Sequence, residues 1–258
     1  MGNARLDVMR EDLKAVLDAV CRGSVYAYRE QLANGGVSTA NGIRLGISGR
    51  PVYENGEIVR YSAPESLAMR IPVVTGMPDV TPLLCRMLGG TPLPQFFGTR
   101  IPAVHPRSVL LIGQPGSGKT TALRALIARL SAGRAALRCA VIDPSGELYD
   151  SFDRRLCHAD FFLGYRKYDG IVRALRFFSP QVIISDEIGD DREADALLRT
   201  QHAGTAVIAA AHGETAESIF RRPGIAQLLK NGIFDCVIRV EKGSEGLIFE
   251  EESMVENA

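Results

Sequence analysis

The chain has 258 residues, of which 46% are hydrophobic and 23% are charged, as in a folded protein of one large or two small domains. Its 30 basic and 30 acidic residues cancel, which argues against the large basic face of a nucleic-acid-binding protein. No apolar run approaches the roughly 20 residues of a membrane helix, and residues 1–12 lack the apolar core of a signal peptide, so no membrane insertion is expected. The five scattered cysteines form no C-x-x-C motif, which favours reduced thiols over a zinc site or a disulfide framework.

Residues 1–78 predict a small α+β domain. Apolar residues recur every three or four positions between Leu6 and Val20, which indicates an amphipathic helix. Two Asn-Gly pairs, at 41–42 and 55–56, then stand between alternating segments, and this dipeptide favours hairpins because both residues tolerate positive φ. A further strand is expected over residues 66–71.

Residues 79–106 predict a linker with one short helix. Asp79 is the expected N-cap of a helix that ends near Leu88, and the remainder is rich in glycine and proline. From residue 107 to 258, apolar strands alternate with helices, which is typical of a parallel sheet covered by helices on both faces. The acidic tail from Glu241 predicts a solvated edge strand and a frayed end. The expected strands cover residues 109–112, 138–142, 182–184, 205–211 and 234–240.

The first of these strands runs into a glycine-rich segment with the pattern G-x-x-x-x-G-K-[ST], the Walker A motif, followed by an amphipathic helix. Glycines allow backbone N–H groups to surround phosphate oxygens, and the helix dipole points at the same anion. Lys119 is expected to reach the β- and γ-phosphates of ATP, and Thr120 to ligate Mg²⁺. The residues expected to bind the nucleotide are Gly113, Gln114, Pro115, Gly116, Ser117, Gly118, Lys119, Thr120 and Thr121.

The strand at 182–184 ends in Asp186-Glu187, which is the Walker B pattern. Asp186 is expected to hold Mg²⁺, directly or through water, and Glu187 to orient or deprotonate the attacking water. The strand at 138–142 lies between the two Walker strands in sequence, as in RecA-like and AAA+ proteins, where another strand separates them in space. The expected fold class is therefore α/β, a RecA-like P-loop NTPase core with a parallel sheet, and the Asp-Glu pair disfavours a small-molecule kinase.

Two further polar residues follow strands at the edge that faces the nucleotide. His212 is a candidate sensor of the γ-phosphate, with an ordinary surface histidine as the alternative. Glu147 is a second candidate for polarising water, with a turn acid as the alternative. An arginine finger from a neighbouring subunit is a further requirement of many such sites. The candidates, which the sequence does not separate, are Arg44, Arg50, Arg60, Arg70, Arg192, Arg199, Arg221 and Arg222.

Several segments together resemble the stage III sporulation protein AA family. These segments are 41–49, 69–72, 113–121, 143–148, 179–189 and 210–213, and the resemblance covers most of residues 30–240. The segments 186–189 (Asp-Glu-Ile-Gly) and 211–213 (Ala-His-Gly), in combination with the N-terminal hairpins, are the most specific. Because that family is similar to type II and type IV secretion ATPases, the resemblance implies a cytoplasmic, hexameric, Mg-ATP-driven motor at the mother-cell membrane that works with channel or secretion proteins in endospore formation. Glu147 would lie in the region of the aspartate box and His212 in the histidine box. The N-terminal region is shorter than the family leads us to expect.

The leading hypothesis is therefore an oligomeric ATPase that energises a secretion or channel apparatus. A nucleic-acid-directed ATPase is an alternative, since RecA-like cores also move on strands, but the neutral net charge counts against it. Another alternative is an assembly protein that uses ATP as a clamp with little turnover, and an intact Glu187 counts against that.

Overall fold

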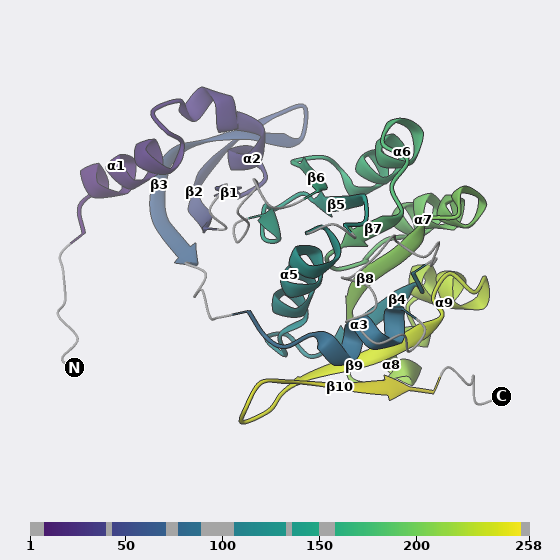
Figure 1. The fold of residues 1–258 in the computed structure, drawn as a ribbon. Coiled ribbons are helices and arrows are strands. Elements are labelled where there is room, and N and C mark those ends of the chain that lie inside the picture. The colour runs from purple at the N-terminus through teal and green to yellow at the C-terminus, as the bar shows by residue number, and fades with distance from the viewer. Residues whose placement is uncertain are drawn as a thin grey trace. The chain divides into compact units, whose positions relative to one another are not determined.

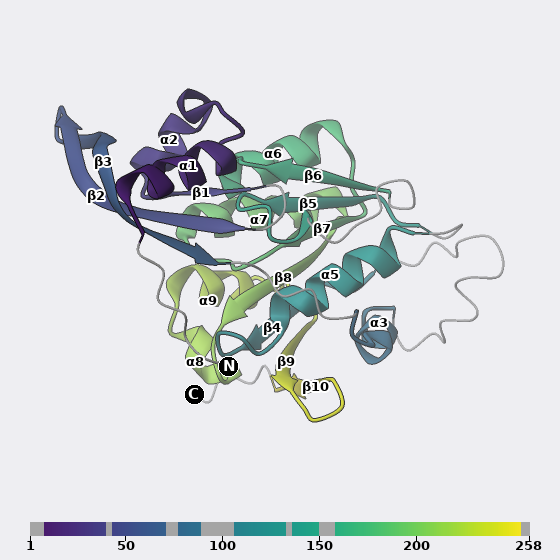
Figure 2. The same cartoon turned by 90° about the vertical axis from the view of Figure 1, so that its left-hand side faces the viewer.

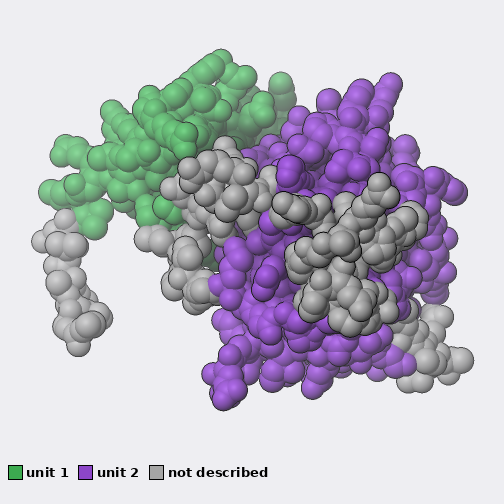
Figure 3. Space-filling view, viewed as in Figure 1, with its two compact units in different colours: residues 1–74 green, residues 75–258 purple. Residues whose placement is uncertain are grey.

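The computed structural model describes residues 8–39, 43–70, 77–88, 106–132, 136–149 and 158–253. The chain divides into two compact units, unit 1 (residues 1–74) and unit 2 (residues 75–258), coloured separately in Figure 3. Each unit has buried apolar residues of its own, a small cluster around Cys21, Leu32 and Val37 in unit 1 and two large clusters in unit 2.

Unit 1 combines two short helices and a 3₁₀ turn with a three-stranded antiparallel sheet in the order β1-β2-β3 (Figure 1). The predicted turn at Asn55-Gly56 is present, with φ values of 52° and 83° that suit these residues. The turn expected at residues 41–42 lies outside the described residues. The elements are α1 (Arg10–Val20), η1 (Val25–Tyr28), α2 (Arg29–Ala33), β1 (Gly36–Ser38), β2 (Arg44–Glu54) and β3 (Glu57–Arg70).

The prediction of a separate strand over 66–71 is wrong. Residues 57–70 form the single strand β3, which pairs with β2 from the hairpin turn as far as Arg70. Shifts of register near Gly49 and Pro51 allow the long pair to continue past the prolines of both strands. Irregularities of register inside one hairpin therefore accommodate the prolines of both strands.

Unit 2 is built on a seven-stranded sheet in the order β10-β9-β4-β8-β7-β5-β6. Its strands run parallel except β10, which pairs antiparallel with β9 at one edge. β8 lies between β4, which leads into the phosphate loop, and β7, which carries the Walker B acids. This confirms the RecA-like arrangement. The strands are β4 (Val109–Gly113), β5 (Cys139–Asp143), β6 (Ala159–Leu163), β7 (Val182–Ser185), β8 (Ala206–His212), β9 (Cys236–Lys242) and β10 (Leu247–Glu252).

Helices cover both faces of this sheet (Figure 1, Figure 2). Successive residues of a strand point to opposite faces, so Leu111 packs with α3 and α5 while Leu110 and Ile112 pack with the helices of the other face. Among the described residues, no helix is long and apolar enough to cross a membrane. One face carries α3 (Thr81–Met87) and α5 (Lys119–Leu130), and the other α6 (Lys167–Phe177), α7 (Asp191–Ala203), α8 (Ala216–Phe220) and α9 (Pro223–Lys230).

Two parts of unit 2 differ from the expectation. The edge strand β6 was not predicted, because its apolar run is only three residues long, Phe161 to Leu163, and follows the charged Asp160. The helix expected inside the linker is α3, but Leu83, Leu84 and Met87 are buried in the core of unit 2. Its N-cap is Val80, and Asp79 accepts a hydrogen bond from the Thr81 N–H at 2.9 Å.

The burial of α3 has a measurable consequence. Met87 has 0% of its surface exposed, whereas Met77 is 53% exposed. We expect Met87→Ala to lower the free energy of unfolding of unit 2 by about 2–5 kcal/mol through lost apolar contacts and a cavity. Met77→Ala, the matched control, is expected to change it by less than about 0.5 kcal/mol. Denaturant unfolding followed by circular dichroism measures both, and equal stability of the two variants would contradict the packing of α3.

Candidate functional site

The phosphate loop joins β4 to α5 at the carboxyl edge of the sheet, and two of its glycines are required by geometry. A Cβ atom at Gly113 would lie 2.6 Å from the main-chain oxygen of Val240 and 2.5 Å from Ser117 Oγ. Gly118 is the N-cap of α5 with φ of 103°, a conformation that side chains disfavour. The chain can therefore turn tightly into the helix and present backbone N–H groups at its first turn.

Lys119 and Ser117 supply the polar side chains of this loop. Lys119 is 6% exposed, and its ammonium donates to the main-chain oxygens of Gly113 at 2.7 Å and Gln114 at 2.9 Å. Burial lowers the pKa of Lys119, while Asp186 and Glu187 oppose that shift. The Ser117 hydroxyl is buried and has no hydrogen-bond partner among the described residues. A loop with an ammonium, a hydroxyl and a helix N-terminus fits the phosphates of a nucleotide.

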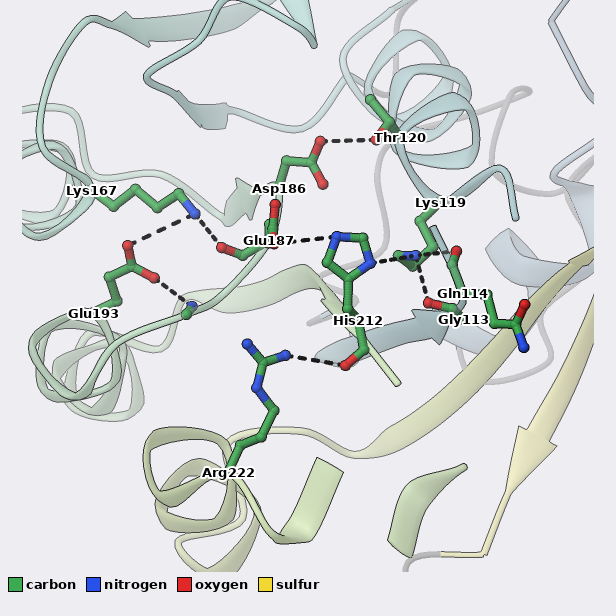
Figure 4. A network of polar contacts seen from close by, with 11 residues as sticks. Gly113, Gln114, Lys119, Thr120, Lys167, Asp186, Glu187, Glu193, His212 and Arg222 are labelled. Carbon is green, nitrogen blue, oxygen red and sulfur yellow. Dashed lines mark hydrogen bonds and ion pairs between the residues drawn. The ribbon is translucent and has the colours of Figure 1, made fainter. Parts of the chain in front are cut away.

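Thr120 and Asp186 meet across the site (Figure 4). Thr120 Oγ1, in the first turn of α5, donates to Asp186 Oδ2, just after β7, at 3.0 Å. A hydroxyl and a carboxylate are oxygen ligands that suit Mg²⁺, which takes its remaining ligands from phosphates and water. The described residues contain no group of three or more His, Cys, Asp or Glu that would hold a metal without such help.

His212 links Lys119 to Glu187 (Figure 4). Its Nδ1 lies 3.3 Å from the Lys119 ammonium, and its Nε2 lies 3.2 Å from Glu187 Oε1. Because an ammonium can only donate, Nδ1 accepts, and Nε2 then carries the proton that points at the carboxylate. The imidazole thus connects a phosphate-binding group to the glutamate expected to act on water.

The sequence analysis did not identify the contacts that hold the main chain of Glu187. Glu187 has φ of 48°, and the next N–H, of Ile188, donates to the Ala210 oxygen of β8 at 2.8 Å. The Lys167 ammonium donates to the Glu187 main-chain oxygen, and Glu193 accepts from the Gly189 N–H at 2.8 Å. Lys167 is the first residue of α6, where the helix dipole disfavours a cation. This unusual position is the feature of the sequence that could have indicated a role for Lys167.

At the end of β5, Asp143 is the buried acid and Glu147 is more exposed. Asp143 accepts hydrogen bonds from the N–H groups of Glu147, Leu148 and Tyr149 at 2.9, 2.9 and 3.0 Å. Burial raises the pKa of Asp143 to about 6, against the effect of these bonds, and the charge of Asp186 adds to the rise. The sequence pointed to Glu147 and not to Asp143, because the burial that distinguishes the two acids is a tertiary property.

Of the arginines considered as fingers in unit 2, Arg222 reaches the site, where Nη1 donates to the main-chain oxygen of His212 at 3.1 Å. Arg221 forms an exposed pair with Glu217 at 3.3 Å. The guanidinium of Arg199 lies 6.0 Å from the ring centre of Tyr168.

A cavity of about 530 Å³ borders the phosphate loop on the side of β9. Residues Gly113 to Ser117 of the loop line this cavity. In the cavity wall, Gln114 Nε2 donates a hydrogen bond to Glu214 Oε1 at 2.5 Å. Its other walls come from the start of α8 and the end of β9, as Glu214, Thr215, Arg239, Val240, Glu241 and Lys242.

Comparisons with known proteins place the whole chain in a family and identify structures with the same fold. A family model described as sporulation stage III, protein AA matches residues 2–250. Stage III sporulation protein AA of Bacillus subtilis (strain 168) is 29% identical over 243 residues, which cover 90% of this chain and 73% of that protein. Protein SEEDLING PLASTID DEVELOPMENT 1 of Arabidopsis thaliana is 35% identical over 135 residues, which cover 49% of this chain and 19% of that protein.

Two solved structures share the fold. The pilus retraction motor PilT, solved with bound ADP, has a TM-score of 0.56 and 17% identity, with 96% of this chain and 71% of that chain covered. The ATPase DotB of Legionella pneumophila has a TM-score of 0.53 and 16% identity, with 96% and 69% covered. The fold of this chain is thus shared with PilT and DotB.

The pKa of Asp143 leads to a prediction about stability. A carboxyl group whose pKa is about 6 in the folded state and 3.8 otherwise stabilises the fold below about pH 4, and this contribution is lost as the pH rises through 6. Relative to wild type, the free energy of unfolding of Asp143→Asn should therefore rise by about 2 kcal/mol between pH 4 and pH 7. Urea unfolding without Mg²⁺ or nucleotide measures this, and parallel pH profiles of the two proteins would contradict it.

Proposed function

The chain belongs to the sporulation stage III, protein AA family, and on that premise we propose that it is a Mg²⁺-dependent ATPase. We further propose that it works as an oligomeric motor, a hexamer, which energises a secretion or channel apparatus in endospore formation. The observation that carries the proposal is the continuous set of contacts from Lys119 through His212 to Glu187, beside the Thr120–Asp186 pair.

The residues of the loop would bind and orient the triphosphate. Lys119 would exchange its bonds to the Gly113 and Gln114 carbonyls for the β- and γ-phosphates, which are stronger acceptors because they are charged. Thr120 and Asp186 would hold Mg²⁺, which offsets the charge that develops on the phosphates. Glu187 would orient the attacking water and accept its proton.

His212 is proposed to report whether the γ-phosphate is present. When Lys119 turns to a phosphate, the contact of 3.3 Å between its ammonium and His212 Nδ1 is given up. The imidazole is then free to move, and the Glu187 carboxylate, which faces its other nitrogen at 3.2 Å, gains freedom with it. Binding of ATP would in this way release the glutamate for work on water.

The cavity beside the loop supports a nucleoside triphosphate as the ligand. It adjoins Gly113 to Ser117 on the side of β9, so a nucleoside attached to phosphates in the loop has room there. Its volume of about 530 Å³ suits a small-molecule site. Its polar wall offers partners for a ribose and a base.

The proposed motor role and the proposed partners are based on the similarity of this chain to other proteins. PilT is described as a pilus retraction motor and DotB as an ATPase, and both share the fold of this chain. The Bacillus subtilis relative is a stage III sporulation protein. We therefore propose further copies of this chain and proteins of a membrane channel or secretion complex as partners, and a place on the cytoplasmic side of the mother-cell membrane.

Substitution of the two central side chains tests the chemistry. Lys119→Ala should abolish ATP binding and turnover, since it removes the ammonium that faces the phosphates. Glu187→Gln should keep ATP binding and lower kcat by about 100-fold or more, because an amide cannot take the proton of water. Glu217→Gln, an exposed glutamate of α8, is the control and should behave as wild type. Phosphate release and binding of a fluorescent ATP analogue give both numbers, and wild-type turnover in Glu187→Gln would rule out its role.

The oligomeric state tests the motor. Light scattering with Mg-ATP should give a mass that is a multiple of 28.0 kDa, with six copies expected, and phosphate release is measured on the same sample. A strict monomer with full turnover would contradict the ring motor. Oligomers with negligible turnover would favour an ATP clamp, and strong, salt-sensitive stimulation by DNA or RNA would favour a nucleic-acid-directed ATPase.

A further inference from the structure

The main chain of Glu187 is held in a conformation that costs free energy. Its φ of 48° lies in the left-handed region, which costs a residue with a Cβ about 1–2 kcal/mol. Asn55, which has a similar φ of 52°, lies in a hairpin turn and belongs to a residue type that tolerates it. Glu187 is not of that type, and such a conformation persists where the surroundings impose it.

The ion pair of Lys167 and Glu193 forms hydrogen bonds to the two peptide groups that follow Glu187 (Figure 4). The Lys167 ammonium donates to the main-chain oxygen of Glu187. The same ammonium lies 3.8 Å from Glu193 Oε1, and Glu193 Oε2 accepts from the Gly189 N–H at 2.8 Å. Lys167 and Glu193 therefore fix the peptides on both sides of Ile188.

The pair is well shielded from solvent and its members come from rigid elements. The side chains of Lys167 and Glu193 are 17% and 15% exposed, so water and salt weaken their attraction less than that of a surface pair. Lys167 begins α6, and Glu193 lies in the first turn of α7, where its N–H donates to the N-cap Asp190 at 2.8 Å. A cation in the first turn opposes the helix dipole, so helix stability does not account for a lysine at this position.

The other side of the segment is fixed by the sheet. Ile188 is buried, and its N–H donates to the Ala210 oxygen of β8 at 2.8 Å. Between these anchors, the Glu187 carboxylate projects toward His212 Nε2. A change of φ at Glu187 would swing the carboxylate away from the imidazole, and the bond from Lys167 to its carbonyl opposes that change.

We infer that Lys167 is a positioning residue for the proposed ATP hydrolysis. Its ammonium, oriented by Glu193, holds the Glu187 peptide in the left-handed conformation and so keeps the carboxylate on the side of the phosphate loop, where it faces His212 in the absence of nucleotide. The inference rests on the proposed function, because it gives Lys167 a role in that reaction. It assigns Lys167 no contact with ATP, so Lys167 acts on the rate and leaves nucleotide binding unchanged.

The test compares Lys167→Met with Lys167→Arg, and uses Lys14→Met, an exposed lysine of α1, as the control. We expect Lys167→Met to lower kcat for ATP hydrolysis by about 10- to 100-fold, with KM and the affinity for a fluorescent ATP analogue within about twofold of wild type. Lys167→Arg retains a cationic donor and should stay within about fivefold of the wild-type kcat. Unchanged kcat in Lys167→Met would overturn the inference, and so would a loss of ATP affinity as large as the loss of kcat.

A second measurement does not depend on turnover. Amide hydrogen exchange at Ile188 and Gly189 in the nucleotide-free protein should be about tenfold or more faster in Lys167→Met than in wild type, and unchanged in Lys14→Met. Equal exchange in all three proteins would show that Lys167 does not hold the segment. A wild-type protein that hydrolyses no ATP would contradict the proposed function, while the exchange rates would still show whether Lys167 restrains Glu187.

Discussion

The site depends on the insertion of β8 between β4 and β7. In the parallel register, Gly113 of β4 lies opposite His212 of β8, and Ser185 of β7 lies opposite Ala209. Neighbouring strands are about 4.8 Å apart, so the ends of β4 and β7 stand two strand spacings from each other. His212 fills that interval and contacts Lys119 on one side and Glu187 on the other. With β4 and β7 as direct neighbours, this edge would have no place for an imidazole between the two groups.

Charge balance in the same region favours the proposed Mg²⁺ site. The buried ammonium of Lys119 feels the negative charges of Asp186 and Glu187. The charge of Asp186 also acts on the carboxyl group of Asp143. Carboxylates crowded around one ammonium carry excess negative charge, and a nucleotide adds more. Two devices relieve this excess: the pKa of Asp143 rises to about 6, and Thr120 with Asp186 offers oxygen ligands to Mg²⁺. A divalent cation would therefore make nucleotide binding compatible with these acids.

The parts of the site that the sequence predicted are those whose chemistry is local. The phosphate loop needs its residues in one run, and the Walker B acids and His212 directly follow apolar strands, so the sequence alone indicated all of them. Lys167 and Asp143 were missed for another reason. Lys167 donates a hydrogen bond to the main-chain oxygen of Glu187, which lies 20 positions further along the chain. The burial of Asp143 depends on segments that are distant in sequence. The merging of residues 66–70 into β3 likewise depends on its pairing with β2.

The hairpin of β9 and β10 packs against the phosphate loop and also carries a cluster of ion pairs. Leu247, at the start of β10, lies so close to Gly118 that a Cβ atom there would stand 2.5 Å from its side chain. β10 is tied to β9 by Arg239, whose guanidinium pairs with Glu241, Glu250 and Glu252. These pairs are partly exposed, so dissolved ions weaken them, whereas the apolar contacts beneath the loop are insensitive to ions. The stiffness of the loop therefore depends on ionic strength through ion pairs that lie outside the loop, at Arg239.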